Sequence, residues 1–550
     1  MFGDNYEKSK DRESRKKIGA FYTPESLVNS VLQKTLAGID ILENPFLKLL
    51  DPSCGCGYFL LSAYKFLFVL FEQNLKMLQN KFKHEWYFIE SSKENKKING
   101  FEYWRIENLS YHILKNCIYG SDIDERAVEI TRENLNRVSK SNVNLDSNII
   151  CCNSLIRWDK DYTVVGKTKE IKNKILFWSR RYDYIVGNPP WVSLSRKFKN
   201  NIDETLANYY MKNYNGNKYL PNLYEYFIKR SLEVLNKNGK LGFVIPDRFA
   251  KNIQYKDFRK YIVEKYNIVN LVFDVEFPGI NTDTMIFVLQ NKFDKHNKVI
   301  VEDKNTVKYI TEQSNYIKNF NTQFYSCQDI KYNSIKDIIE SNSYKLGDIS
   351  TTFTGFIGKS SIITKNRKTN SQIKIIKGEN IDKYKVLGNF YYEFIDENIK
   401  GGTKNLDKLR YKGKIVIRKT GREIVSAIDY DGNVIEQSLY GIIVNSEAIY
   451  PEYILGILNS KLMKWYYRNF MVTNYRSMPQ IKKYSLDRIP IRVCDTHKEE
   501  YIRNIVLNII NCTDENEIKI LQGKLDNIIF SIYGIHEDSR KSILQLLEVY

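Results

Sequence analysis

Short apolar runs alternate with longer amphipathic stretches from about Ile18 to Asn291. Apolar runs of roughly four to eight residues between polar turns are typical of strands buried in a sheet, and the stretches between them have the length of helices. The runs expected to form strands are 47–50, 117–119, 148–150, 182–186, 240–245, 268–273 and 284–289. This rhythm predicts an α/β fold with a mostly parallel sheet, of which 284–289 is the last strand.

A long segment interrupts the alternation of apolar runs and helical stretches between the first two strands. A polar segment follows the last expected strand. Residues 69–111 are charged and aromatic and exceed what one crossover helix needs, so we expect a helical insertion there. Residues 292–343 are rich in Lys and Asn and show no clear period, which indicates a connecting segment. An α/β domain over 1–291 is therefore expected to precede this connection.

The remainder of the chain has a different amino-acid composition. It is richer in Gly, Thr and β-branched residues, with strand-like pieces at 414–418 and 442–444. From about residue 498 to the end the pattern becomes helical. We expect a second domain of α+β type over 344–550, ending in a helical tail.

The net charge of the chain indicates which class of partner it binds. The 550 residues hold 84 Lys and Arg against 65 Asp and Glu, a formal charge of +19. Such an excess favours nucleic acid over a neutral small substrate. No apolar run is long enough to span a bilayer and the first residues lack the apolar core of a signal peptide, so we expect a cytoplasmic protein without a membrane partner. The eight cysteines include no CxxC pair, and we expect no metal site and no disulfide framework.

Candidate chemistry is strongest at Asn188-Pro189-Pro190-Trp191, directly after the run 182–186. The exocyclic amine of an adenine is a poor nucleophile because its lone pair is delocalised into the ring. Side-chain and backbone carbonyls on one rigid turn can accept hydrogen bonds from such an amine, and an indole can stack on the base. The plainer interpretation is a Pro-Pro turn that closes a strand, with Trp191 in the core.

A second candidate follows the first strand, where Asp51, Ser53, Gly55 and Gly57 form a small-residue loop before a helix. Glycines let the backbone approach a ligand, and the acid and hydroxyl can meet an ammonium and other polar groups of an amino-acid-like cofactor. The spacing matches neither G-x-G-x-x-G nor the P-loop, which disfavours NAD and ATP.

Polar residues also end the next two strands. Asp122 can bind ribose hydroxyls, Ile123 can pack on a purine face, and Asn153 can contact a purine edge. Each alone could be an ordinary loop residue. Because they follow neighbouring strands of one sheet, we expect them to lie together at its crevice.

In this order of motifs the chain resembles the TaqI-type, gamma-class N6-adenine DNA methyltransferases. The segment Gly-Ala-Phe-Tyr-Thr-Pro at 19–24 matches the family's first motif, and the cofactor loop, the Asn-Pro-Pro-Trp motif and a C-terminal target-recognition domain follow. The resemblance implies a Rossmann-like domain that binds S-adenosyl-L-methionine, with Tyr22 and Thr23 over its methionine part. Asn153 stands where the family usually has Asp, and Trp191 where Tyr is more frequent.

The resemblance also implies DNA-contacting residues. Phe277 stands where similar enzymes stack an aromatic ring on the flipped adenine, although it could equally be a core residue. Residues 401–425 hold eight Lys/Arg against two acids, and 461–490 hold seven against one with interleaved aromatics. Either stretch could instead be a solvated face. The cations expected to bind DNA are Lys414, Arg418, Lys419, Arg422, Arg468 and Arg476.

Taken together, the sequence predicts a site-specific DNA adenine N6-methyltransferase that flips its target base and transfers the methyl group by direct in-line attack. Double-stranded DNA is the expected partner of a monomeric modification enzyme without a nuclease domain, with any restriction endonuclease a separate protein. An RNA adenine or protein glutamine methyltransferase, or an inactive DNA-binding relative, stays an alternative. The basic C-terminal region argues against the glutamine version.

Overall fold

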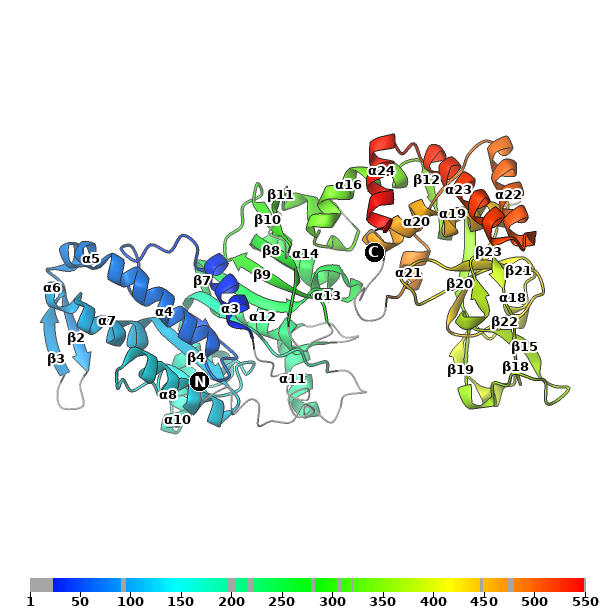
Figure 1. Ribbon diagram of the computed structural model, residues 1–550. Coiled ribbons are helices and arrows are strands. Elements are labelled where there is room, and N and C mark those ends of the chain that lie inside the picture. Colours follow the sequence, from blue (N-terminus) through cyan, green and yellow to red (C-terminus); the bar gives the residue numbers. More distant parts are fainter. Residues whose placement is uncertain are drawn as a thin grey trace. The chain divides into compact units, whose positions relative to one another are not determined.

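The computed structural model describes residues 23–90, 95–194, 203–215, 221–277, 282–303, 308–318, 320–445, 449–471 and 479–548. The chain divides into two compact units, residues 1–327 and 328–550 (Figure 1). Each unit has its own core, and each is considered by itself.

A nine-stranded mixed sheet forms the centre of the first unit, in the order β11-β10-β8-β9-β7-β6-β1-β4-β5. Five neighbouring strands run parallel, and β9 lies antiparallel between β7 and β8. The strands are β1 (Leu49–Asp51), β4 (Ile118–Asp122), β5 (Ile149–Cys151), β6 (Tyr182–Gly187), β7 (Leu235–Pro246), β8 (Asn267–Val275), β9 (Thr284–Gln290), β10 (Lys298–Glu302) and β11 (Lys308–Glu312). The expected α/β class and all of the expected strands are confirmed.

The sheet does not end where the sequence predicts. Strand β10 pairs parallel with β8, and β11 pairs antiparallel with β10. Both come from the polar segment 292–343, so the prediction that 284–289 is the last strand is wrong. The segment also contributes α15 (Ser314–Lys318), and it continues into α16 (Cys327–Glu340).

Helices bury the sheet because their apolar positions recur at helical spacing. In α4 (Tyr58–Gln73), the buried residues include Phe59, Leu60, Ala63, Leu67 and Phe71. The other helices beside the sheet are α3 (Glu25–Thr35), α8 (Glu125–Ser139), α10 (Lys169–Trp178), α11 (Glu204–Tyr214), α12 (Leu223–Val234), α13 (Arg248–Lys251) and α14 (Lys256–Lys265). Within the described part of the chain, no helix combines the length and the apolar character needed to cross a bilayer.

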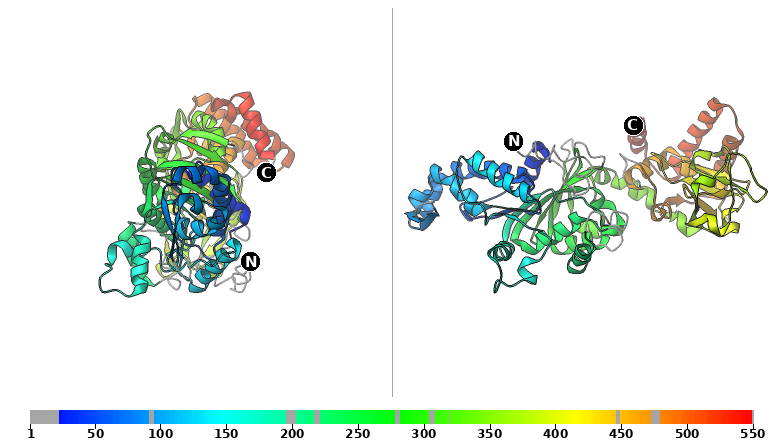
Figure 2. Two further views of the ribbon diagram at one scale, coloured as in Figure 1. Left: turned by 90° about the vertical axis from the view of Figure 1, so that its left-hand side faces the viewer. Right: turned by 90° about the horizontal axis from the view of Figure 1, so that it is seen from below.

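The insertion at 69–111 is only partly helical. Between α5 (Leu75–Phe82) and the short helices α6 (Gly100–Tyr103) and α7 (Ile106–His112) lies an antiparallel hairpin, β2 (Trp86–Glu90) with β3 (Asn95–Asn99). Figure 1 and the right-hand view of Figure 2 place these elements at the end of the first unit away from β10. Buried aromatic rings hold the hairpin to the helices, among them Tyr87 stacked on Tyr103 at 4.2 Å.

The second unit is α+β, as expected. A four-stranded sheet has the order β13-β23-β20-β21 and a three-stranded sheet the order β18-β15-β22. Their strands are β13 (Ser350–Thr354), β15 (Ile373–Ile376), β18 (Phe390–Tyr392), β20 (Lys414–Arg418), β21 (Ser426–Asp429), β22 (Val434–Ile435) and β23 (Leu439–Val444). The helices are α19 (Pro451–Asn459), α20 (Lys461–Tyr466), α22 (Thr496–Asn511), α23 (Glu515–Ile532) and α24 (Glu537–Glu548). The last three form the expected helical tail.

Candidate active site

Sequence-distant motifs meet at one edge of the first sheet. Strand β1 lies between β4 and β6, and β5 lies beside β4, all parallel. Their carboxyl ends therefore carry the loops that begin at Asp51, Asp122, Cys151 and Gly187 to the same side. Ligands of open α/β sheets bind in the crevice at this edge, where the order of strands reverses.

Left-handed glycines shape the loop after β1. Gly55 has φ 51° and Gly57, which precedes α4, has φ 90°. Side chains rarely adopt such angles, so glycine is needed at both places. The Gly55 N–H donates to Asp122 Oδ2 at 2.9 Å, and its carbonyl accepts from Thr131 Oγ1 at 2.7 Å. The loop is thus attached to the end of β4 and to α8.

Asp51 is a buried carboxyl at the base of this loop. One of its oxygens accepts the Ser53 N–H at 3.0 Å, and the residue is 1% exposed. Burial raises the pKa of Asp51 to about 8, with a further upward effect from the Asp122 carboxylate. A Cβ on Gly187 would lie 2.7 Å from Asp51 Oδ1, so glycine lets the end of β6 approach this carboxyl. A cation placed at Asp51 would find an acid without a charged partner of its own among the contacts of the described residues.

Asp122 is held by the backbone on both oxygens. Oδ1 accepts the Asp124 N–H at 3.0 Å, and Oδ2 accepts Gly55. Burial raises the pKa of Asp122, while these N–H groups lower it. The neighbouring Ile123 side chain is 71% exposed, which leaves an apolar surface at the crevice. An acid with a fixed orientation beside an exposed isoleucine fits a ribose and a purine face.

The Asn153 side chain makes two hydrogen bonds that the sequence does not predict. Its Nδ2 donates to the Tyr210 hydroxyl at 2.7 Å, and its Oδ1 accepts the Leu155 N–H at 3.0 Å. Tyr210 belongs to α11, 57 residues away in sequence. No pattern in the sequence points to Tyr210, because its partner is set by packing of α11 on this loop.

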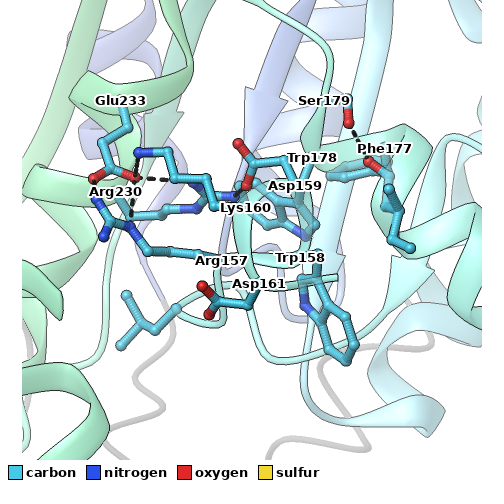
Figure 3. A network of polar contacts seen from close by, with 12 residues as sticks. Arg157, Trp158, Asp159, Lys160, Asp161, Phe177, Trp178, Ser179, Arg230 and Glu233 are labelled. Carbon is cyan, nitrogen blue, oxygen red and sulfur yellow. Dashed lines mark hydrogen bonds and ion pairs between the residues drawn. The ribbon is translucent and has the colours of Figure 1, made fainter. Parts of the chain in front are cut away.

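A network of charges secures the same loop farther along, shown in Figure 3. Arg157 and Lys160 bind Glu233 of α12, the latter at 3.2 Å. Arg230, only 1% exposed, binds Asp159 at 2.5 Å and Glu233 at 3.0 Å and lies over the Trp178 ring at 4.8 Å. Because these ions neutralise one another around the buried Arg230 guanidinium, the network is a structural one.

The Asn188 side chain has one satisfied end and one open end. Its Nδ2 donates to Thr23 Oγ1 at 3.1 Å. Its Oδ1 is buried, and no residue in the described part of the chain donates to it. A buried acceptor without a donor carries a cost in free energy unless a ligand supplies one. Thr23, expected over the cofactor, thus touches the Asn-Pro-Pro-Trp turn; Tyr22 lies outside the described residues.

The aromatic rings near this turn contact one another. Trp191 and Phe277 lie edge to face, with centroids 5.3 Å apart and an interplanar angle of 65°. Phe277 is 6% exposed. Pro189 is buried and Pro190 half-buried. The two rings are adjacent, as the expected stacking roles require, but they must separate before a base can lie between them.

Two of the cations expected to bind DNA are buried or half-buried in the second unit. Lys414 is 0% exposed and its Nζ binds Asp429 Oδ2 at 2.6 Å, so its assignment to DNA is wrong. Arg418 is half-buried, and its guanidinium donates to the carbonyls of Gly378 and Ile381. These two side chains stabilise the second unit, because β20 is a central strand paired on both edges.

The other cations expected to bind DNA differ in exposure. Lys419 lies 4.4 Å from the centroid of the Tyr440 ring, and desolvation lowers its pKa to about 8. Arg422 is exposed and Arg468 half-buried, whereas Arg476 lies outside the described residues. The aromatic residues expected to interleave with these cations are mostly core: Trp465, Tyr466 and Tyr467 are all buried.

Comparison with known proteins agrees with this arrangement. Residues 116–276 match the Eco57I restriction-modification methylases, and residues 373–491 match the TaqI-like C-terminal specificity domains. The first match contains the Asn188 turn and the second contains β20. The resemblance found in the sequence motifs is confirmed by both.

Relatives support the same family. The type II restriction enzyme and methyltransferase RM.Eco57I of Escherichia coli is 26% identical over 405 residues, which are 68% of this chain and 37% of that enzyme. The type II methyltransferase M.BstVI of Geobacillus stearothermophilus is 30% identical over 263 residues, 46% of this chain and 38% of that protein. The chain thus matches well under half the length of either relative.

Solved structures with the same fold include the Type IIL restriction-modification enzyme MmeI in complex with DNA, at a TM-score of 0.63 and 14% identity over 97% of this chain and 79% of that chain. A nuclease-deletion mutant of the Type ISP enzyme LlaGI gives a TM-score of 0.57 and 12% identity over 90% and 47%. The chain therefore contains a region similar to the Eco57I restriction-modification methylases, followed by a region similar to the TaqI-like C-terminal specificity domains.

Proposed function

We propose that this protein is a site-specific DNA methyltransferase that modifies the N6 amine of adenine with S-adenosyl-L-methionine. The observation that carries the proposal is the Asn188 side chain, whose buried oxygen lacks a donor among the described residues while its nitrogen is held by Thr23. An amine is the group that such an acceptor would take. The order of motifs, which resembles the gamma-class enzymes, supports adenine.

The proposed chemistry needs few protein groups. The cofactor supplies an activated methyl group on a sulfonium. Asn188 Oδ1 and the Pro189 carbonyl accept hydrogen bonds from the target amine and direct its lone pair at the methyl carbon, so that the N–C bond forms as the C–S bond breaks. The amine then loses a proton to solvent. No covalent enzyme intermediate is required.

The crevice residues fit the proposed cofactor. The Asp51 carboxyl can bind the ammonium of the methionine part, Asp122 the ribose hydroxyls, and the exposed Ile123 the purine face. Ser53, Gly55 and Gly57 allow close approach.

The target base must leave the duplex to reach a turn recessed at the sheet edge. Extrusion costs a few kcal/mol, and stacking on Trp191 and Phe277 offsets it once the rings separate. The second unit would hold double-stranded DNA through Lys419, Arg422 and Arg468, and the protein would act as a monomer.

The decisive experiment compares two substitutions of one residue. Asn188→Ala removes the acceptor and should reduce methyl transfer by roughly 100- to 1000-fold. Asn188→Asp keeps an acceptor oxygen and should retain measurable activity. Calorimetry should show cofactor binding intact in Asn188→Ala and weakened in Asp122→Ala. Mass spectrometry of digested DNA should detect N6-methyladenine; N4-methylcytosine alone would contradict the adenine assignment.

Two further outcomes separate the alternatives. Methylation of RNA, or of a glutamine peptide, in preference to duplex DNA would favour the other methyl acceptors. The name of RM.Eco57I joins restriction and methylation in one protein. We infer that this chain only modifies DNA, and incubation of unmodified DNA with the protein and Mg²⁺ should leave it uncut.

A further inference from the structure

The Arg248 side chain has a buried donor without an acceptor. Its Nε is closed to solvent, and no group in the described part of the chain accepts from it. Arg230 and Arg503 also have such an Nε, but their side chains lie against carboxylates, Asp159 at 2.5 Å and Glu452 at 3.6 Å. Among the described residues, no carboxylate pairs with Arg248 in this way. A buried donor of a charged group carries a cost in free energy unless a ligand supplies the acceptor.

The sheet places Arg248 at the edge that carries the Asn-Pro-Pro-Trp turn. Strand β7 pairs parallel with β6, with Phe243 opposite Gly187, so both strands end on the same side. The turn 188–191 follows Gly187, and Arg248 comes two residues after Pro246, the last residue of β7. Arg248 is half-buried at this edge.

Helix α12 connects Arg248 to the same turn from the other direction. The Leu223 N–H at the start of the helix donates to the Val192 carbonyl at 3.0 Å, directly after the turn. The next residue, Tyr224, packs against Phe249 with ring centroids 6.4 Å apart. Burial raises the pKa of the Tyr224 phenol, and the nearby charge of Arg248 acts in the opposite direction. The guanidinium therefore lies near the first turn of α12.

The acids in this region do not neutralise Arg248. Burial and the charge of Asp283 raise the pKa of Asp247 to about 7, so this carboxyl is only partly ionised at neutral pH. Glu225 of α12 pairs with Lys229 at 3.1 Å. Arg248 thus keeps a positive charge and open donors for an anion that comes from outside the chain.

The position of β7 indicates which anion this is. The acids that fit the cofactor follow β1 and β4, on one side of β6, whereas β7 lies on the other side. A guanidinium binds phosphate through two parallel hydrogen bonds. We propose that Arg248 binds a phosphate that flanks the target adenosine and so holds the flipped nucleotide in front of Asn188. The inference rests on the proposed function, because it takes DNA as the substrate, and the contact adds to those expected of the second unit.

The test uses the full chain and duplexes in which one phosphate is replaced by an uncharged methylphosphonate, after sequencing of methylated DNA has located the target adenine. With the wild-type protein, neutralising one of the two flanking phosphates should lower kcat/KM for methyl transfer by about 10- to 100-fold. Arg248→Gln should show a similar loss on the natural duplex and little further loss on the modified one. Lys260→Gln removes an exposed cation that pairs with Glu264 on α14, and it should respond like the wild type.

Two further measurements separate other roles of Arg248. Calorimetry should give the same affinity for S-adenosyl-L-homocysteine in Arg248→Gln and the wild type; a loss of about tenfold would assign Arg248 to the cofactor carboxylate and overturn the inference. The melting temperature of Arg248→Gln should equal or exceed that of the wild type, because no bond within the described part of the chain is lost. Arg230→Gln, which breaks ion pairs, should melt at a lower temperature.

Three other results would overturn the inference. One is an equal sensitivity of Arg248→Gln and the wild type to methylphosphonate at both flanking positions. Another is a loss of thermal stability in Arg248→Gln as large as that in Arg230→Gln, and the third is a failure of Arg248→Gln to fold, since either would show a structural role. If the wild-type chain methylated no DNA, the proposed function would fail and the inference with it, whereas full activity of Arg248→Gln would overturn the inference alone.

Discussion

At the scale of single residues, the burial of Asp51 is expected to make ligand binding depend on pH. Its pKa of about 8 means that the folded protein holds a proton there at pH 7, whereas an ammonium ligand needs the ionised form. Affinity for S-adenosyl-L-homocysteine should therefore rise by up to about tenfold per pH unit between pH 6 and 8, with proton release on binding. Calorimetry in two buffers of different ionisation enthalpy measures that release, and Asp51→Asn should abolish it.

The same group predicts the sign of a stability change. Because the folded pKa lies above the ordinary value of 3.8, the folded state binds more protons between those two values. The contribution of Asp51 to the free energy of unfolding is thus greatest below about pH 4 and is lost as the pH rises towards 8. In Asp51→Asn, stability should depend less on pH over this range; an identical pH profile would contradict the buried assignment.

Lys414 makes a second prediction at this scale. Lys414→Met would leave Asp429 buried without its cation, and we expect a loss of about 3–5 kcal/mol in the free energy of unfolding. The neighbouring Lys412 is exposed, so Lys412→Met should change stability by less than about 0.5 kcal/mol. Urea unfolding of both variants checks this. Equal and small losses in the free energy of unfolding of the two variants would contradict the burial of Lys414.

Which single residues the sequence could predict depends on the range of their partners. Asp51, Asp122 and Asn188 follow apolar strands directly, so the pattern places them at one sheet edge. The burial of Lys414 depends on strands pairing on both sides of β20, and the contact of Tyr210 depends on a helix packed from 57 residues away. Neither the burial of Lys414 nor the contact of Tyr210 can be predicted from the spacing of nearby residues.

At the scale of elements, strands that coincide with apolar runs are predictable from the sequence, whereas β10 and β11, which lie in a polar segment, are not. Residues 241–245 of β7 and 285–289 of β9 are apolar runs without a charged residue, and they are buried because other strands pair with both of their edges. Strand β11 alternates between half-exposed and exposed residues, so its sequence resembles a polar loop. The hairpin β2–β3 lies in the segment expected to be helical, and its apolar residues Trp86 and Phe88 are exposed at 60% and 64%.

Strands β10 and β11 give a prediction about truncation. The Gln313 side chain donates to the carbonyls of Val263 and Tyr266, and buried Arg259 donates to those of Asn321 and Thr322. A chain ending at residue 327 should therefore unfold cooperatively and bind S-adenosyl-L-homocysteine. One ending at residue 291 should be markedly less stable in thermal unfolding, because Arg259 loses acceptors and β8 loses a neighbour. Equal melting temperatures would show that the added strands do not stabilise the unit.

At the scale of the whole molecule, we expect the net charge and the division into two units to determine how the proposed DNA substrate is bound. The net charge of +19 predicts that affinity for duplex DNA falls steeply with salt, since bound phosphates release counterions. Because residues 373–491 match the specificity domains, recognition should reside in the second unit. The truncated chain ending at residue 327 should keep cofactor binding and lose sequence-specific methylation.

Salt dependence can also assign single contacts in the whole protein. Arg422 is exposed in the second unit, and its replacement by Ala should weaken binding to all duplexes and reduce the slope of log affinity against log salt by about one. Arg126 is equally a surface arginine, but it pairs with Glu129 on α8 of the first unit, so Arg126→Ala should leave the slope unchanged. Fluorescence anisotropy over a range of salt concentrations measures both slopes. If Arg126→Ala reduced the slope and Arg422→Ala did not, the phosphate contacts would belong to the first unit and the assignment of DNA binding to the second would be wrong.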